Sequence, residues 1–198
     1  MKLLMISLFM GLFLNASAEK TPSTEKTPTD TKVVCAIEPV KKQFALGESP
    51  KFNFTVMNNS DKKILLVKIL DGSSFKSREP QGYFEVTGPD GKIISGSRGR
   101  CGNTNPLKAS DFVWIKAGEK VKLAEHGLSL WNGQFNKEGT YKIKFHYTTA
   151  NDDFRKWVGG PMGPDGIKAV KKECGDLFKS RHKVSETLEL EIEIVAKK

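Results

Sequence analysis

The sequence predicts an all-β protein, an immunoglobulin-like sandwich of two antiparallel sheets with one short helix in its last long loop. Apolar and polar residues alternate with period two in short runs from residue 33 onward, a pattern typical of half-buried strands. Clusters of Gly, Pro, Asn and Asp separate these runs, and short strands joined by such turns are typical of two packed sheets. The segment 33–198 is long enough to form a single domain with its own core.

The expected strands are, in order, 33–39, 52–57, 64–67, 83–86, 92–95, 112–115, 121–123, 141–147 and 188–194. The run 64–67 is apolar throughout, which favours a central strand. Gly88-Pro89-Asp90-Gly91 predicts a hairpin between the fourth and fifth of these strands, because Pro fixes φ and Gly accepts a positive φ.

The last two expected strands have the clearest alternation. Lys142, Lys144 and His146 alternate with apolar residues in 141–147, and glutamates alternate with Leu and Ile in 188–194. A slip of one residue would exchange the core and solvent faces, so the register is well defined. If the two strands pair, a lysine stripe lies beside a glutamate stripe on a solvated face. Each cross-strand pair then contributes a few tenths of a kcal/mol up to about 1 kcal/mol.

The N-terminus predicts export. Residues 1–18 combine an early lysine, an apolar run and small residues before Ala18, which is typical of a signal peptide cleaved after Ala18. The apolar run is too short for a membrane span. Residues 19–32 contain EKTP twice and no large apolar residue, so we expect a disordered Thr/Pro/Lys linker. The mature protein is then secreted or periplasmic, with the sandwich at 33–198.

The formal net charge of the chain is +9. A basic surface favours acidic partners such as anionic lipids or acidic glycans. The lysines are dispersed along the sequence, however, and such a distribution is more typical of a soluble surface than of a nucleic-acid interface. We therefore expect no nucleic-acid partner and no membrane span.

Three cysteines, Cys35, Cys101 and Cys174, follow the predicted signal peptide. In an oxidising compartment this number predicts one disulfide and one remaining thiol. Cys101 and Cys174 both lie in loop-like, Gly-containing surroundings, so we expect a Cys101–Cys174 bridge, which would stabilise the fold by roughly 4 kcal/mol. Cys35 lies in a strand and would be buried.

The segment 148–184 is a long connection between the last two strands. It contains a Gly- and Pro-rich run at 159–166 and apolar residues at helical spacing within 167–178, which predict the short helix. A connection of this length is either functional or packs as a separate excursion from the sandwich.

The tryptophans are candidates for a binding site. Trp114 lies within an expected strand, so we place it in the core. Trp131, Arg155 and Trp157 lie in or beside loops, and a Trp next to basic groups is frequent in binding sites. These three residues are the candidate binding residues, although the sequence favours semi-buried packing over a binding role for each Trp.

Gly139-Thr140-Tyr141 resembles the entry to the penultimate strand of immunoglobulin-like domains, where the Tyr hydroxyl bonds back to the backbone. The immunoglobulin core disulfide is absent, because Ile143 occupies the position two residues after Tyr141 and 52–57 contains no Cys. Further characteristic pieces occur in order at 46–48, 57–60, 88–92, an Arg near position 100, 112–119, 128–130 and 139–141, followed by a closing strand within 179–194. In these pieces the chain resembles the immunoglobulin-like domain of secreted deuterolysin-type zinc peptidases, and it also resembles small secreted proteinase inhibitors of the BsuPI type.

The resemblance does not extend to catalysis. A zinc peptidase needs two histidines one helical turn apart with a glutamate between them. His126, His146 and His182 are far apart in the sequence, so we predict no metal, no cofactor and no catalytic residues.

These patterns together predict a secreted or periplasmic, non-enzymatic binding module that recognises a protein or a glycan through its loops. The alternative is an inhibitor or accessory subunit of an exported peptidase. A hydrolase with a metal site assembled from scattered residues is a third hypothesis, with the least support.

Overall fold

The strands form two packed sheets and a separate two-stranded ribbon. The computed structural model describes residues 32–69, 78, 81–95, 105–124, 128–130, 132–158 and 163–197. The first sheet has the order β1-β3-β8, with β9 also pairing with β3, and comprises β1 (Val33–Pro39), β3 (Lys51–Asn58), β8 (Lys120–Lys122) and β9 (Leu128–Ser129). The second sheet has the order β2-β11-β10-β5-β6 and comprises β2 (Gln43–Ala45), β11 (Ser185–Val195), β10 (Gly139–Thr148), β5 (Gly82–Thr87) and β6 (Ile93–Ser95). The ribbon pairs β4 (Ile64–Val67) with β7 (Phe112–Ile115).

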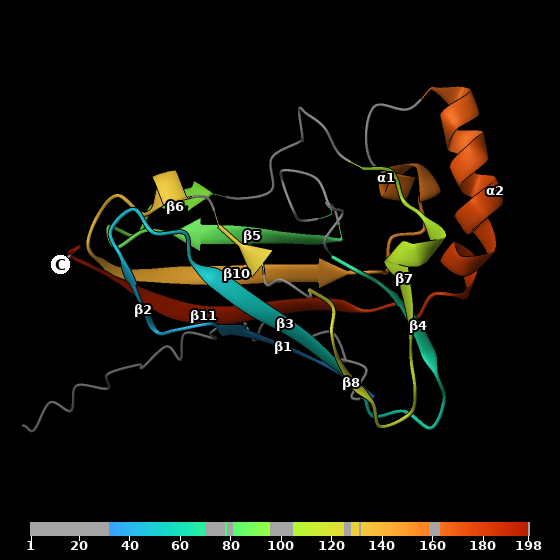
Figure 1. Ribbon diagram of the computed structural model, residues 1–198, viewed down its shortest axis with the longest axis horizontal. Coiled ribbons are helices and arrows are strands. Elements are labelled where there is room, and N and C mark those ends of the chain that lie inside the picture. The colour runs from blue at the N-terminus through green and yellow to red at the C-terminus, as the bar shows by residue number, and fades with distance from the viewer. Residues whose placement is uncertain are drawn as a thin grey trace, which may run out of the picture.

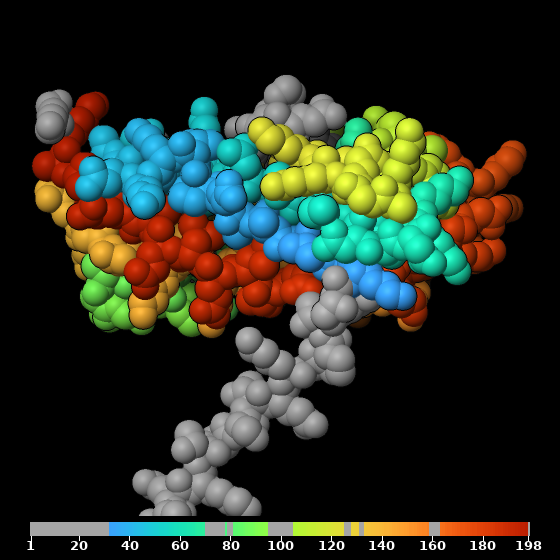
Figure 2. Space-filling view, turned by 90° about the horizontal axis from the view of Figure 1, so that it is seen from below, coloured from blue at the N-terminus to red at the C-terminus, as the bar shows by residue number. Residues whose placement is uncertain are grey.

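The predicted all-β sandwich is confirmed, with one exception to its antiparallel pairing. β2 runs parallel to β11, and the register places Phe44 opposite Ile194. The chain leaves the first sheet after Pro39 and joins the second sheet at Gln43, so one N-terminal segment serves both sheets. Figure 2 shows the result, with β1 (blue) lying alongside β11 (red) on this side of the molecule.

An aromatic cluster fills the space between the two sheets. The Phe54 ring lies 5.0 Å from Phe145 and 5.0 Å from Tyr147, centroid to centroid, and Phe84 lies 4.8 Å from Phe145. Phe54, Phe145 and Tyr147 are fully buried. Their inward direction follows from the alternation in β3 and β10, because successive strand residues point to opposite faces.

Strand β4 of the ribbon is buried on both faces, which explains the apolar run at 64–67. Ile64 and Leu66 belong to the core between the sheets, whereas Leu65 and Val67 belong to a second apolar cluster. This second cluster is completed by the helices α1 (Phe154–Val158) and α2 (Pro164–Ser180). Figure 1 shows both helices stacked beside β4 and β7 at one end of the molecule.

The predicted helix in the last loop is confirmed and is longer than expected. α2 begins at Pro164, three residues before the predicted start, because Pro is well tolerated at the first helical position, where its missing N–H is not needed. Val170, Cys174 and Phe178 recur every four residues along its buried face. The segment 148–184 is therefore a packed excursion from the sandwich.

Two short 3₁₀ helices, η1 (Ala109–Asp111) and η2 (Asn132–Gln134), complete the elements.

The predicted pairing of the last two strands is also confirmed. Lys142 lies opposite Glu191 and Lys144 opposite Glu189 in the β10–β11 register. The Lys144 Nζ to Glu189 Oε1 distance is 3.4 Å, and both side chains are exposed. Exposed ion pairs of this kind contribute little to stability, so the stripe is a solvated sheet face.

Tyr141 makes the backbone contact that its sequence context predicts. Its hydroxyl donates to the Lys137 carbonyl oxygen at 3.0 Å and accepts from the Lys137 N–H at 3.3 Å. Gly139, two residues earlier, has a φ of 127°, and a Cβ at this position would lie 3.0 Å from the Pro89 Cβ. Glycine is therefore required at the entry to β10.

Replacing Tyr141 with Phe is expected to lower the free energy of unfolding by about 1–2 kcal/mol, because the ring stays buried while two hydrogen bonds are lost. Urea denaturation followed by far-UV circular dichroism measures the change. Tyr83→Phe is the matched control, since the Tyr83 ring lies on the outer face of the sheet, stacked on His146 at 4.4 Å. Equal effects of the two substitutions would contradict the role of the Tyr141 hydroxyl.

Among the described residues, none of the helices has the length and apolarity needed to cross a bilayer.

Candidate functional site

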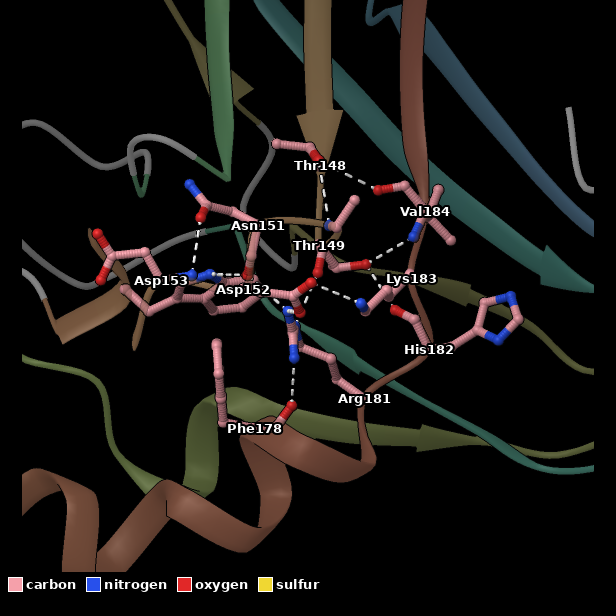
Figure 3. Close-up of polar contacts among 12 residues, drawn as sticks. Thr148, Thr149, Asn151, Asp152, Asp153, Phe178, Arg181, His182, Lys183 and Val184 are labelled. Carbon is pink, nitrogen blue, oxygen red and sulfur yellow. Dashed lines mark hydrogen bonds and ion pairs between the residues drawn. The ribbon is translucent and has the colours of Figure 1, made fainter. Parts of the chain in front are cut away.

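The end of β10 and the end of α2 are joined by a buried arginine, Arg181, shown in Figure 3. Its guanidinium donates to the Thr149 carbonyl oxygen at 2.7 Å, to the Phe178 carbonyl oxygen at 2.6 Å and to the Asn151 carbonyl oxygen at 2.5 Å. It also lies 3.0 Å from Asp152 Oδ1. One guanidinium thus provides hydrogen bonds to three backbone carbonyl oxygens, two in the segment after β10 and one near the end of α2.

Asp152 forms the exposed side of this network. Hydrogen bonds from Lys183 and Arg181 hold the pKa of the Asp152 carboxyl below its usual value. The aspartate is charged over the neutral pH range and pairs with both Arg181 and Lys183, so the arrangement fixes the helical excursion to the sandwich.

The structure separates the three candidate binding residues. Trp157 is only 1% exposed, its Nε1 donates to the Asn151 carbonyl oxygen at 2.9 Å, and the Arg181 guanidinium lies 4.9 Å from its ring centroid. Trp157 therefore packs in the interior, where it is more deeply buried than the semi-buried packing that the sequence favoured. Arg155 is exposed on α1, two residues away along the chain. Trp131 lies outside the described residues.

The described residues contain no disulfide, and both cysteines among them are free thiols. Cys174 is buried, and its Sγ contacts the Leu107 carbonyl oxygen at 3.7 Å. Cys101 lies outside the described residues, so the structure gives no support to the predicted Cys101–Cys174 bridge, and the pairing stays a prediction. Burial raises the pKa of Cys174 to about 11, and burial together with the Glu186 carboxyl raises that of Cys35 to about 12. Neither thiol has the lowered pKa that a nucleophile needs.

The described histidines lie in different surroundings. His146 stacks on Tyr83 on the outer face of the second sheet, with its Nδ1 3.1 Å from Thr187 Oγ1. Partial burial lowers the His146 pKa, with Glu85, Lys144 and Glu189 as the nearest charges. His182 follows α2, and its backbone N–H donates to the Leu65 carbonyl oxygen at 2.8 Å. His126 lies outside the described residues. Within the described ranges, no group of three or more His, Cys, Asp or Glu residues could hold a metal ion.

A buried asparagine joins two turns at the end of β3. Asn58 is fully buried, and its amide nitrogen donates to the Lys62, Ile115 and Lys116 carbonyl oxygens at 2.7, 3.1 and 3.1 Å. Its Oδ1 accepts from the Ser60 N–H at 3.0 Å and from the Ser60 hydroxyl at 2.6 Å. The turns 59–63 and 116–119 are therefore held together, and Figure 2 shows them side by side (teal and yellow-green).

Trp114 is exposed beside these two turns, and its predicted place in the core is wrong. The side chain is 47% exposed, and Lys63 Nζ lies 4.5 Å from its ring centroid. The ribbon face that carries Trp114 also carries Leu65, which lies opposite it and is buried in the cluster formed with the helices. Trp114 therefore lies on the same ribbon face as the buried Leu65, but its own side chain is exposed to solvent near the end of the ribbon that carries the two turns.

Trp114, Lys63 and Lys116 are the residues we define as the Trp114 patch. Lys63 directly precedes β4, with its Nζ over the Trp114 ring, and Lys116 is exposed directly after β7, two residues from Trp114. The turns that flank the patch rest on the Asn58 hydrogen bonds, so the patch has a fixed backbone. Sequence reasoning missed it, because a Trp inside an apolar run is indistinguishable from a core residue.

No protein-family model matches the chain, and no curated protein matches it either. Among solved structures, the chain is similar to a mutant β-glucosidase from Listeria innocua in complex with laminaribiose, with 13% identity over 83% of this chain and a TM-score of 0.34. The gluconolactone complex of that β-glucosidase has 16% identity over 82% of this chain and a TM-score of 0.32. The chain spans only 16% of the length of these enzyme chains. The ASH/PapD-like domain 7 of human CEP192 is 12% identical over 94% of this chain and 98% of its own, with a TM-score of 0.28. At these TM-scores the similarity supports no inference about function.

Proposed function

We propose that this protein is an exported, non-enzymatic binding module that recognises a protein or a glycan through the Trp114 patch. The observation that carries the proposal is the exposure of Trp114 on a fixed backbone. Covering the exposed part of this ring with a ligand would contribute about 2–3 kcal/mol from burial of apolar area. Because the Asn58 hydrogen bonds already order the two flanking turns, little conformational entropy is lost on binding.

Export is supported by the sequence of residues 1–18, which has the charged start, apolar run and small-residue end of a signal peptide. A role without catalysis is supported by the raised pKa values of Cys35 and Cys174 and by the structural use of Asp152 and Arg181.

Replacing Trp114 with Ala is expected to weaken ligand binding roughly 10- to 100-fold while leaving the fold intact, because the ring is an exposed interface residue and not part of the core. Protein recovered from the host periplasm or medium is applied to an array of glycans and envelope proteins, and the mass of this sample also tests cleavage after Ala18. Met57→Ala is the matched control, since Met57 is exposed on the outer face of the first sheet. An array signal that survives Trp114→Ala, or one that falls equally with Met57→Ala, would contradict the proposal.

The same sample separates the binding module from a peptidase inhibitor. Host culture peptidases are assayed with and without a micromolar concentration of the protein. Inhibition that is unaffected by Trp114→Ala would favour the inhibitor and contradict the role of the Trp114 patch.

A further inference from the structure

The Trp114 patch has two exposed lysines at one end of the ribbon. Lys63 directly precedes β4 and Lys116 directly follows β7, and the β4–β7 register places Ile64 opposite Ile115, so both lysines leave the ribbon at the same end. The Asn58 hydrogen bonds to the Lys62 and Lys116 carbonyl oxygens hold the backbone of the two turns together. Two positive charges on neighbouring turns repel each other, and an anion bound beside both of them relieves this repulsion.

Among the described residues, no carboxylate forms an ion pair with the ammonium group of Lys63 or Lys116. The Glu119 carboxylate accepts from the Lys116 backbone N–H at 2.7 Å, which closes its own turn and leaves one negative charge there against the two lysines. Asp61 is exposed and lies two residues before Lys63 in the sequence. The Lys63 ammonium lies over the Trp114 ring, a weak cation–π partner that an anion can replace or share.

We infer that the Trp114 patch binds an acidic polysaccharide, with a sugar ring against the Trp114 indole and sugar carboxylates or sulfates against Lys63 and Lys116. This inference rests on the proposed function and specifies its ligand class. An exposed indole offers an apolar surface to the face of a sugar ring, and two lysines on a fixed backbone complement a regularly charged chain. The lysines also disfavour a protein partner, because aromatic residues and Arg are enriched at protein interfaces whereas Lys is depleted.

The test measures binding of polygalacturonate, a polymer with one carboxylate on each sugar, by isothermal titration calorimetry at about 50 mM and about 200 mM NaCl. Neutral dextran and single-stranded oligothymidylate are the comparison probes. The double substitution Lys63→Ala/Lys116→Ala is expected to weaken polygalacturonate binding about tenfold at the lower salt concentration. The matched control is Lys168→Ala/Lys172→Ala, which removes the same charge from the exposed side of α2 and is expected to change the affinity less than about twofold.

The outcomes separate this inference from the proposed function. Equal losses in the two double variants, or tighter binding of oligothymidylate than of polygalacturonate, would overturn the acidic-polysaccharide inference. Dextran binding that depends on Trp114 but not on the lysines would also overturn it, while leaving the proposed function in place. Array binding that ignores Trp114 would remove both. Preferential polygalacturonate binding that requires Trp114, Lys63 and Lys116 is the expected result.

Discussion

Arg181→Met is expected to lower the free energy of unfolding by about 3 kcal/mol, which corresponds to a fall in Tm of roughly 6–12 °C for a domain of this size. Methionine retains the apolar contact with the rings of Trp157 and Phe178, which the Arg181 guanidinium approaches to 4.9 and 3.9 Å. It provides no donor, however, so the Thr149 and Phe178 carbonyl oxygens lose their buried hydrogen-bond partner. Leaving buried polar groups unpaired costs more than the net gain of forming each bond.

The matched control for this substitution is Lys183→Met. Lys183 Nζ lies 2.7 Å from Asp152 Oδ2, so it shares a partner with Arg181, but its side chain is 56% exposed. Loss of an exposed ion pair changes stability by at most about 1 kcal/mol. Thermal and urea unfolding of both variants measure the difference. If Arg181→Met were no more destabilising than Lys183→Met, the buried network would not be what fixes the excursion to the sandwich.

Asn58→Asp is expected to lower the free energy of unfolding by about 3–5 kcal/mol at pH 7, although the two side chains have nearly the same shape. The substitution replaces an amide nitrogen that donates to three carbonyl oxygens with a carboxylate oxygen that can only repel them. The charge would be fully buried without a cation, so the pKa of the new carboxyl would be raised in the folded state.

The pH dependence of Asn58→Asp gives a second measurement of the same effect. A carboxyl with a raised pKa in the folded state binds its proton more tightly there than in the unfolded chain. The destabilisation is therefore largest above the folded-state pKa and shrinks as the pH falls toward the unfolded value. Asn59→Asp is the control, because Asn59 is exposed and the change in charge is identical. A loss of stability as small as that of Asn59→Asp, or one that does not change with pH, would contradict the role of the Asn58 amide.

Period-two alternation predicts most of this fold because most strands have one buried and one solvated face. The register of β10 and β11 follows directly from that pattern, and the Tyr141 contact follows from its position after Gly139. β2 could not be predicted, since three residues are too few to show a period, and its parallel pairing depends on the chain crossing between sheets.

The candidate site was predicted less well than the fold, for a physical reason. In 112–115 every residue is apolar, so the sequence does not show that the helices cover Phe112 but stop short of Trp114. Trp157 presents the reverse case, because Arg155 and Lys156 face solvent while one further helical step turns the indole toward Phe178. Whether Trp114 or Trp157 is exposed depends on how far the helices of the segment 148–184 extend over the β4–β7 ribbon. No local sequence pattern around either tryptophan indicates how far they extend.

The strand β11 has a consequence for when the domain can fold. It is the last strand that the structure describes, yet it pairs along its length with β10 and, through Glu193, with β2 at Gln43 near the start of the domain. Contacts between residues so far apart in sequence close slowly, since the entropy of a long loop is lost before the contact is made. The second sheet therefore stays incomplete until β11 has been synthesised. For a chain that we propose is exported, this order favours threading through a narrow translocation channel before the second sheet is complete.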